Sequence, residues 1–88
     1  ALFFWPTGNL MAPNGSGGFR RAPRYYVPGV ADISGIYKGL PVFFEVKRHN
    51  GSLSKAQRLF GDRAEYNRGR YFLVRSVQDV IEALEKIT

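Results

Sequence analysis

Residues 30–47 read VADISGIYKGLPVFFEVK, and this stretch decides the fold. Two β-prone runs, 30–37 and 42–47, flank the turn sequence KGLP at 38–41. Runs of this kind on either side of a short glycine-containing turn predict an antiparallel hairpin. The hairpin is therefore the predicted centre of a β-sheet, and the rest of the chain is interpreted around it.

Each predicted strand has two faces, because residues two apart on a strand point the same way. In the first strand, Ala31, Ile33 and Tyr37 oppose Asp32, Ser34 and Ile36. In the second strand, the predicted core face is Val42, Phe44 and Val46, and the opposite face is Phe43, Glu45 and Lys47. Glu45 and Lys47 thus share a face of a mostly apolar strand, and the hairpin brings Asp32 beside Glu45.

Upstream of the hairpin the chain is rich in loop-forming residues. Positions 1–41 hold twelve of the fifteen glycine and proline residues. A strand is predicted over 2–5, closed by Pro6. Loops and short strands are expected over 7–28, with the turn cluster PNGSGG at 13–18.

Downstream, two helices and a further strand are predicted. Ser54 and Gln57 form a capping box that begins the first helix, and Gly69 ends it. Ser76 and Asp79 form a second capping box, and the helix that it begins runs to the end of the chain. The apolar positions at helical spacing are Ala56, Leu59, Phe60 and Ala64 in the first helix and Val77, Val80, Ile81, Leu84 and Ile87 in the second.

The predicted order is strand, strand, strand, helix, strand, helix, with the last strand at 71–75. This order is typical of an α/β fold with a mixed central sheet flanked by helices. With 88 residues, the chain has room for one domain, spanning 1–88.

Composition excludes several classes of site and of location. The chain has no cysteine, which excludes disulfides and thiolate metal sites. His49 is its only histidine, which excludes a zinc site built from several histidines. No apolar run reaches the roughly 20 residues of a membrane helix, and no basic region precedes the apolar start as in a signal peptide. We expect no membrane partner and a chain that is not secreted, located in a bacterial or phage-infected cytoplasm or in a eukaryotic nucleus.

The charge distribution indicates a polyanionic partner. The net charge is +6, and residues 1–76 hold twelve bases against four acids. Arg20, Arg21 and Arg24 lie beside two tyrosines, a combination that suits phosphate contact and base stacking. The alternative is a loop whose tyrosines pack and whose arginines are solvated.

Asp32, Glu45 and Lys47 are the candidate catalytic group. Two adjacent carboxylates repel each other unless a cation lies between them, and oxygen ligands suit Mg²⁺ or Mn²⁺. A neighbouring ammonium can position a water and offset developing charge. These parts suit metal-assisted hydrolysis of a phosphodiester. The alternative is a surface pair of Glu45 with Lys47 and a turn-capping Asp32.

Four motifs in order resemble a known nuclease family. GVADI at 29–33 and FEVKR at 44–48 resemble the core of the PD-(D/E)xK nucleases. GSLSKAQ at 51–57 and RSVQDV at 75–80 more narrowly resemble the VRR-NUC (virus-type replication-repair nuclease) domain. The similarity covers about residues 3–84, nearly the whole chain.

The resemblance implies a restriction-endonuclease-like core and a role for each matching residue. It implies that Asp32, Glu45 and the backbone carbonyl of Val46 bind the divalent metal, that Lys47 is the catalytic lysine, and that Gln57 orders the edge of the site. It further implies a DNA endonuclease that acts as a homodimer on branched DNA such as four-way junctions. The family usually has an acidic residue on a helix before the first strand, and this chain has no acid before Asp32. We expect either that water replaces that ligand or that the chain is part of a longer protein.

Further basic residues near these motifs are candidate DNA contacts: Arg48, Lys55 and Arg58. His49, beside Arg48, either contacts phosphate or assists proton transfer, or it is only a turn residue. Two other functions stay open, a non-catalytic basic nucleic-acid-binding module and a subunit-interaction domain that docks through its acidic C-terminal helix.

Overall fold

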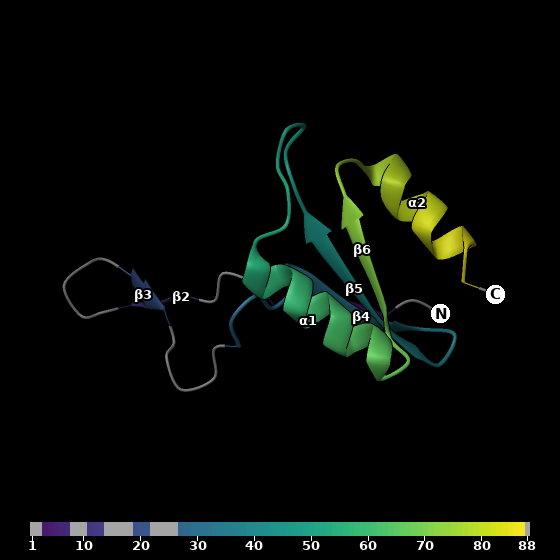
Figure 1. Ribbon diagram of the computed structural model, residues 1–88, viewed down its shortest axis with the longest axis horizontal. Helices are drawn as coiled ribbons and strands as arrows, with labels where there is room; N and C mark the ends of the chain where they lie inside the picture. The colour runs from purple at the N-terminus through teal and green to yellow at the C-terminus, as the bar shows by residue number, and fades with distance from the viewer. Residues whose placement is uncertain (1–2, 8–10, 14–18, 22–26, 88) are drawn as a thin grey trace.

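The computed structural model describes residues 3–7, 11–13, 19–21 and 27–87 (Figure 1). Its elements, in chain order, are β1 (Phe3–Pro6), β2 (Met11–Pro13), β3 (Phe19–Arg21), β4 (Ile33–Tyr37), β5 (Leu40–Val46), α1 (Lys55–Tyr66), β6 (Arg70–Val74) and α2 (Val77–Glu85). Four strands form one sheet in the order β1-β4-β5-β6. The first two pairings are antiparallel and β5–β6 is parallel, so the sheet is mixed and the predicted α/β fold is confirmed.

The predicted hairpin is the β4–β5 pair, closed by a turn of two residues. Tyr37 pairs with Leu40, which leaves only Lys38 and Gly39 in the turn. Both have positive φ angles, 52° and 80°. This is the twist that tight hairpins require, because it matches the right-handed twist of the strands. Leu40 and Pro41, predicted as part of the turn, belong to β5 instead.

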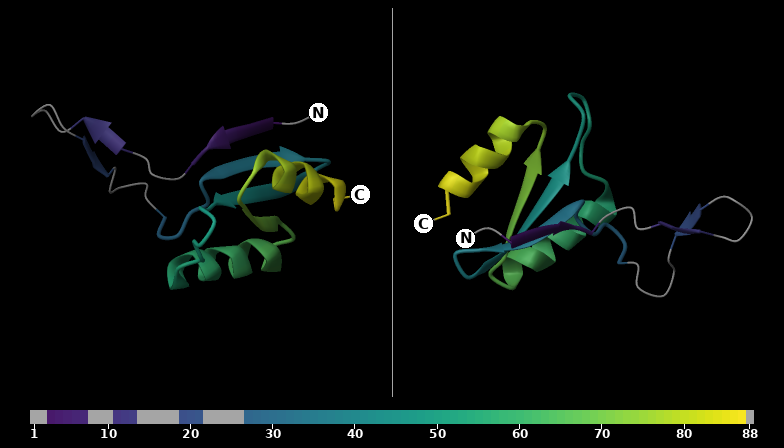
Figure 2. Two further views of the ribbon diagram at one scale, coloured as in Figure 1. Left: turned by 90° about the horizontal axis from the view of Figure 1, so that it is seen from above. Right: turned by 180° about the vertical axis from the view of Figure 1, so that it is seen from behind.

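The two helices cover opposite faces of the sheet. Phe43 packs against Phe60 of α1 with ring centroids 5.2 Å apart. Its neighbour Phe44 belongs to the buried cluster that includes Ala83 and Ile87 at the α2 side. Since successive strand residues point to opposite faces, α1 and α2 lie on opposite sides. Figure 2 shows α1 as a layer beneath the sheet in its left view.

The apolar stripes are buried only in part. On α1, Phe60 and Ala64 are half-buried, whereas Ala56 and Leu59 are exposed. On α2, Val77 and Ile81 are 77% and 45% exposed, and Ala83 supplies the buried contact that the spacing did not predict. Val46, predicted as a core residue, is 49% exposed because it lies at the end of β5. The sheet therefore buries only part of the apolar stripe of each helix.

The helix ends confirm one capping box and correct two other predictions. Ser54 and Gln57 make the predicted reciprocal bonds at the start of α1. Ser76 accepts from the Asp79 N–H, but the Asp79 carboxylate accepts from the N–H of Arg75 rather than that of Ser76. At the end of α1, the left-handed residue is Arg68, with φ 69°, and not Gly69.

The segment between β1 and β4 contains a second sheet that the sequence predicted only as loops and unspecified short strands. β2 and β3 pair antiparallel, with Met11 opposite Arg21. Figure 1 shows this pair apart from the four-stranded sheet. Arg20 and Arg21 lie on β3, whereas Arg24 lies outside the described residues. Of the predicted turn over 13–18, Pro13 belongs to β2 instead, and 14–18 lie outside the described residues.

Neither helix in the described part of the chain has the length and apolarity needed to cross a membrane.

Candidate active site

Asp32 and Glu45 lie side by side at one end of the β4–β5 hairpin. Ile33 pairs with Phe44 in the antiparallel register. Asp32, one residue before Ile33, therefore lies opposite Glu45, one residue after Phe44, and both acids are on the α1 face. The Asp32 Oδ2 accepts a hydrogen bond of 2.8 Å from the backbone N–H of Val46. The side chain of Asp32 is thereby held across the strand that carries Glu45, as predicted.

Thr7 holds the backbone around Asp32 in place. Its N–H donates to the carbonyl of Asp32 at 2.9 Å, which extends the β1–β4 pairing by one residue. Its hydroxyl donates to the carbonyl of Ala31 at 2.7 Å and lies 2.7 Å from the hydroxyl of the buried Ser34. No sequence signal pointed to Thr7, because its partners are 24 to 27 residues away.

Glu45 is a buried carboxylate, with 3% of its surface exposed. Its Oε2 accepts from the Gln57 amide at 3.1 Å and lies 3.9 Å from the Lys47 ammonium. Its Oε1 is buried and has no hydrogen-bond partner among the described residues. Burial and the neighbouring Asp32 raise the pKa of Glu45 to about 7, against a smaller opposing effect of Lys47.

Gln57 has two partners at once. Its Oε1 accepts from the Ser54 N–H at 2.8 Å, and its Nε2 donates to Glu45. The capping box fixes the side chain at the start of α1, and that position places the free end of the amide over β5. Gln57 thus contacts the predicted site while it also caps the helix.

Gly29 allows α1 to approach the segment just before β4, which carries Asp32. Its φ is +75°, and a Cβ there would lie 2.2 Å from the carbonyl oxygen of Ala56. A side chain would therefore collide with the backbone of the first helical turn. The GVADI motif gave Gly29 no role in the site, and only the packing of α1 reveals one.

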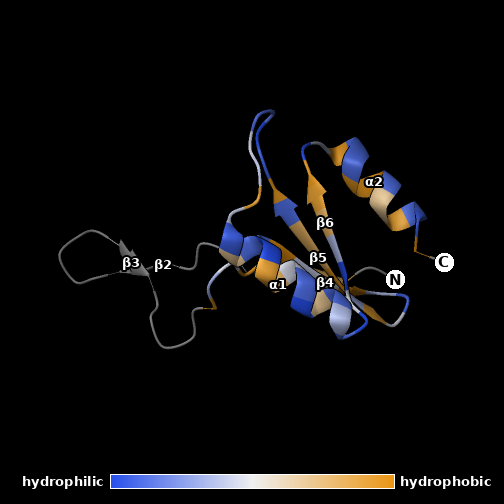
Figure 3. Cartoon of the chain, viewed as in Figure 1, coloured by the Kyte–Doolittle hydropathy of each residue, from blue (hydrophilic) through white to orange (hydrophobic). Residues whose placement is uncertain are grey.

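The three other predicted DNA contacts are exposed. Arg48 follows Lys47 in the loop after β5, and Lys55 and Arg58 flank Gln57 on the first turn of α1. Figure 3 shows the hydrophilic end of β5 leading into this loop. His49 is also exposed.

Arg75 anchors this loop from the end of β6. Its guanidinium donates to the carbonyl of Arg48 and, at 3.1 Å, to that of His49. The loop that follows the predicted catalytic lysine is thus tied to the strand beside it. Arg75 belongs to the motif RSVQDV at 75–80. Its contacts with the 48–49 loop span 26 to 27 residues, so no local sequence signal predicts them.

The donor set fits a hard divalent cation. The two adjacent carboxylates supply oxygen ligands, which Mg²⁺ and Mn²⁺ prefer, and Glu45 Oε1 is a buried acceptor with no hydrogen-bond partner among the described residues. Within the described residues, no cluster of three or more acidic, histidine or cysteine side chains forms. A cation at this site would be held by the oxygens of Asp32 and Glu45, and water would supply most of the octahedral set that Mg²⁺ takes.

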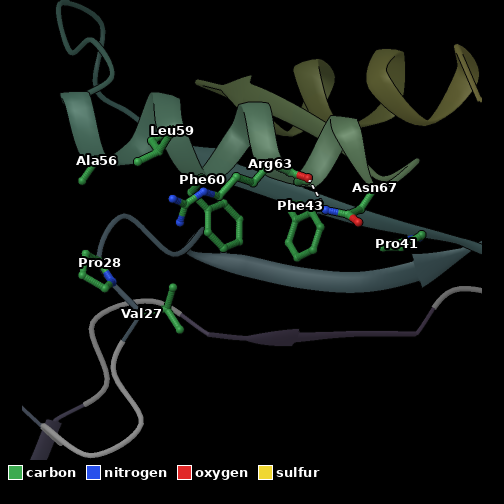
Figure 4. Close-up of a pocket in the computed structure, with 10 residues that line it drawn as sticks. Val27, Pro28, Pro41, Phe43, Ala56, Leu59, Phe60, Arg63 and Asn67 are labelled. Atoms are coloured by element: carbon green, nitrogen blue, oxygen red, sulfur yellow. Dashed lines mark hydrogen bonds between the residues drawn. The ribbon is translucent and has the colours of Figure 1, made fainter.

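A separate apolar groove of about 500 Å³ lies along α1 (Figure 4). Phe43 and Phe60 project into it, and Val27 and Pro28 face them from the segment before β4. Among the described residues that line it, Arg63 is the only charged one. The groove contains none of the candidate catalytic residues, so it is distinct from the carboxylate pair.

No family model, curated protein or solved structure matches this chain.

Proposed function

We propose that the chain is a divalent-metal-dependent DNA endonuclease, with Asp32, Glu45 and Lys47 at its centre. The observation that carries the proposal is the pairing of two acids on one sheet face beside an ammonium. One of these acids is buried and has an unpaired oxygen. If Glu45 and Lys47 formed only a surface ion pair, we would expect neither a second carboxylate beside them nor a buried Glu45. Such pairs form in contact with water and contribute little to stability.

The protein residues divide the work of phosphodiester hydrolysis among them. Asp32, Glu45 and the Val46 carbonyl would hold the cation, and the Gln57 amide keeps the Glu45 carboxylate oriented. A bound divalent cation polarises a phosphoryl oxygen and makes water easier to deprotonate. The Lys47 ammonium orients the attacking water and offsets negative charge in the transition state.

The basic residues around this site support DNA as the substrate. Thr7, which bonds the backbone of Asp32, directly precedes the segment 8–26 in the chain. This segment contains Arg20, Arg21 and Arg24 and no acidic residue. Together with Arg48, Lys55 and Arg58, these bases suit contact with phosphates. Phosphate contacts carry no base sequence, so the protein would recognise DNA by its shape.

The finer assignment is a VRR-NUC-type nuclease that cuts branched DNA as a homodimer. It is supported by the order of the four motifs and by the fit of Asp32, Glu45, Lys47 and Gln57 to one site. The test is incubation of labelled four-way junction and linear duplex with the protein, with and without Mg²⁺ or Mn²⁺. We expect metal-dependent cleavage, with the junction cut in preference to the duplex.

Single substitutions separate cutting from binding. Glu45→Gln, Asp32→Asn and Lys47→Ala should each lower the cleavage rate about a hundredfold or more, because each removes a charge used in the transition state. Only the two carboxylate variants should also weaken metal binding, measured by calorimetric titration. DNA binding without metal should persist in all three. It should rise in the two carboxylate variants, because carboxylates repel phosphate.

The same variants and assays test the alternative, a non-catalytic nucleic-acid-binding module. If Glu45→Gln and Lys47→Ala cut as fast as the unaltered protein, the nuclease proposal is wrong. DNA binding without any metal-dependent cleavage would identify the chain as a non-catalytic nucleic-acid-binding module.

A further inference from the structure

Two buried side-chain atoms lack hydrogen-bond partners among the described residues: Glu45 Oε1 and the Tyr71 hydroxyl oxygen. They are chemically complementary, because a carboxyl oxygen can accept a hydrogen bond and a phenol can donate one. Buried polar groups in folded proteins are nearly always paired, directly or through water. Two orphans of opposite kind in one small domain therefore call for a common explanation.

The two residues lie on the same face of the sheet. Tyr71 pairs with Phe43 and Glu45 pairs with Leu73 in the parallel β5–β6 register, so Tyr71 and Glu45 are diagonal neighbours. Phe43 and Glu45 are two apart and share a face, and Tyr71 shares it with Phe43. Both side chains are thus directed into the layer between the sheet and α1.

One helix covers both of them. Gln57 of α1 bonds Glu45, and Gly61, one turn later, lies over the Tyr71 ring. A Cβ on Gly61 would come within 2.7 Å of that ring, and the Phe60 ring centroid lies 6.0 Å from it. The ring of Tyr71 is therefore confined, and its hydroxyl has little freedom to seek bulk water.

The charges of the site act on this hydroxyl. Burial raises the pKa of Tyr71 to about 12, and the negative charges of Glu45 and Asp32 contribute to the rise. The hydroxyl therefore keeps its proton at any physiological pH and is available as a donor near the two acids.

We propose that Tyr71 is a positioning residue for Glu45, whose hydroxyl donates to Glu45 Oε1 through one bridging water. The Gln57 amide donates to Oε2, so the carboxylate is held from α1 and from β6 at once. A water in this place has polar partners on both sides, as a buried water requires. The contact itself does not depend on the proposed nuclease activity, whereas its effect on cleavage does.

A double-mutant cycle in the metal-free protein tests the contact without any assay of activity. Tyr71→Phe removes only the oxygen, and Glu45→Met removes the acceptor while it keeps an apolar side chain of similar length. In the unaltered background, Tyr71→Phe should raise the unfolding equilibrium constant about fivefold, as expected for one lost hydrogen bond. In the Glu45→Met background this loss should disappear.

The control is Tyr66→Phe, at a tyrosine of α1 that is 88% exposed, which should change neither background. If Tyr71→Phe stabilises both backgrounds equally, the hydroxyl is an isolated buried group and the inference is overturned.

The catalytic arm measures kcat and KM on DNA. Tyr71→Phe should lower kcat about tenfold and leave KM unchanged, because the hydroxyl acts on Glu45 and touches no DNA. Coupling in the cycle with an unchanged kcat would overturn the positioning role. If the unaltered protein does not cleave at all, the proposed function fails, and the stability cycle still decides the contact.

Discussion

At the scale of single residues, the burial of Glu45 should make the stability of the metal-free protein depend on pH. Its pKa is raised from 4.5 to about 7, so between these values the folded chain binds a proton that the unfolded chain has released. The free energy of unfolding therefore falls as the pH rises from about 4.5 to 7, by about 3 kcal/mol in total, and then levels off. Asp32 strengthens this trend by charge repulsion, and Lys47 opposes it.

Urea unfolding in the presence of a chelator, repeated across this pH range, measures the effect. Glu45→Gln is the control. Its unfolding free energy should depend much less on pH, because the amide does not titrate. Mg²⁺ added near pH 8 should restore stability to the unaltered protein by binding only the folded state. A flat profile for the unaltered protein would show that Glu45 is ionised in the fold without a cation.

At the scale of elements, the contact between Gly29 and α1 sets the distance between Asp32 and Gln57. Gly29→Ala should destabilise the fold by roughly 2 kcal/mol or more, because it adds both a disfavoured backbone angle and a collision with the Ala56 carbonyl. It should also lower cleavage, since α1 carries Gln57. The measurement is thermal unfolding together with the junction assay.

Gly39→Ala is the matched control for that prediction. Gly39 has a similar φ of +80°, but nothing lies within 4 Å of a Cβ built there. This variant should lose only roughly 1 kcal/mol of stability, which is the cost of backbone strain, and it should keep its cleavage activity. Equal losses in the two variants would mean that packing against α1 contributes nothing.

At the scale of the whole molecule, the basic residues should control DNA affinity more than chemistry. Arg20, Arg21 and Arg24 changed together to Ala should weaken binding and reduce the slope of log affinity against log salt by roughly one unit per lost phosphate contact. The control removes the same charge at Arg63, Arg68 and Lys86. Filter binding at several salt concentrations measures both slopes, and an unchanged slope would show that the segment does not touch DNA.

Self-association is the second prediction at this scale. In the described sheet, β1 is an edge strand, and its Phe3 and Trp5 are 65% and 41% exposed. Apolar edge strands favour pairing with another copy, and two β1 strands can pair antiparallel about a twofold axis. Trp5→Lys should therefore shift a dimer toward monomer, with Tyr66→Lys as the exposed control.

Analytical ultracentrifugation at micromolar concentration measures this prediction. A mass near 9.9 kDa for the unaltered chain would contradict it and would remove the basis for paired cuts.

The sequence by itself determined the β4–β5 hairpin, the capped start of α1 and the pairing of Asp32 with Glu45. Each of these depends on alternation, turn chemistry or capping within a short stretch, and such local rules can be applied without knowing the fold. The tertiary structure alone decided what surrounds the acids: the hold of Thr7 on Asp32, the anchoring of the 48–49 loop by Arg75, the close approach of α1 at Gly29 and the position of Tyr71 under that helix. The same holds for how much of each apolar stripe is buried. These contacts join residues far apart in the chain, and they form only because side chains of separate elements are packed together at fixed distances.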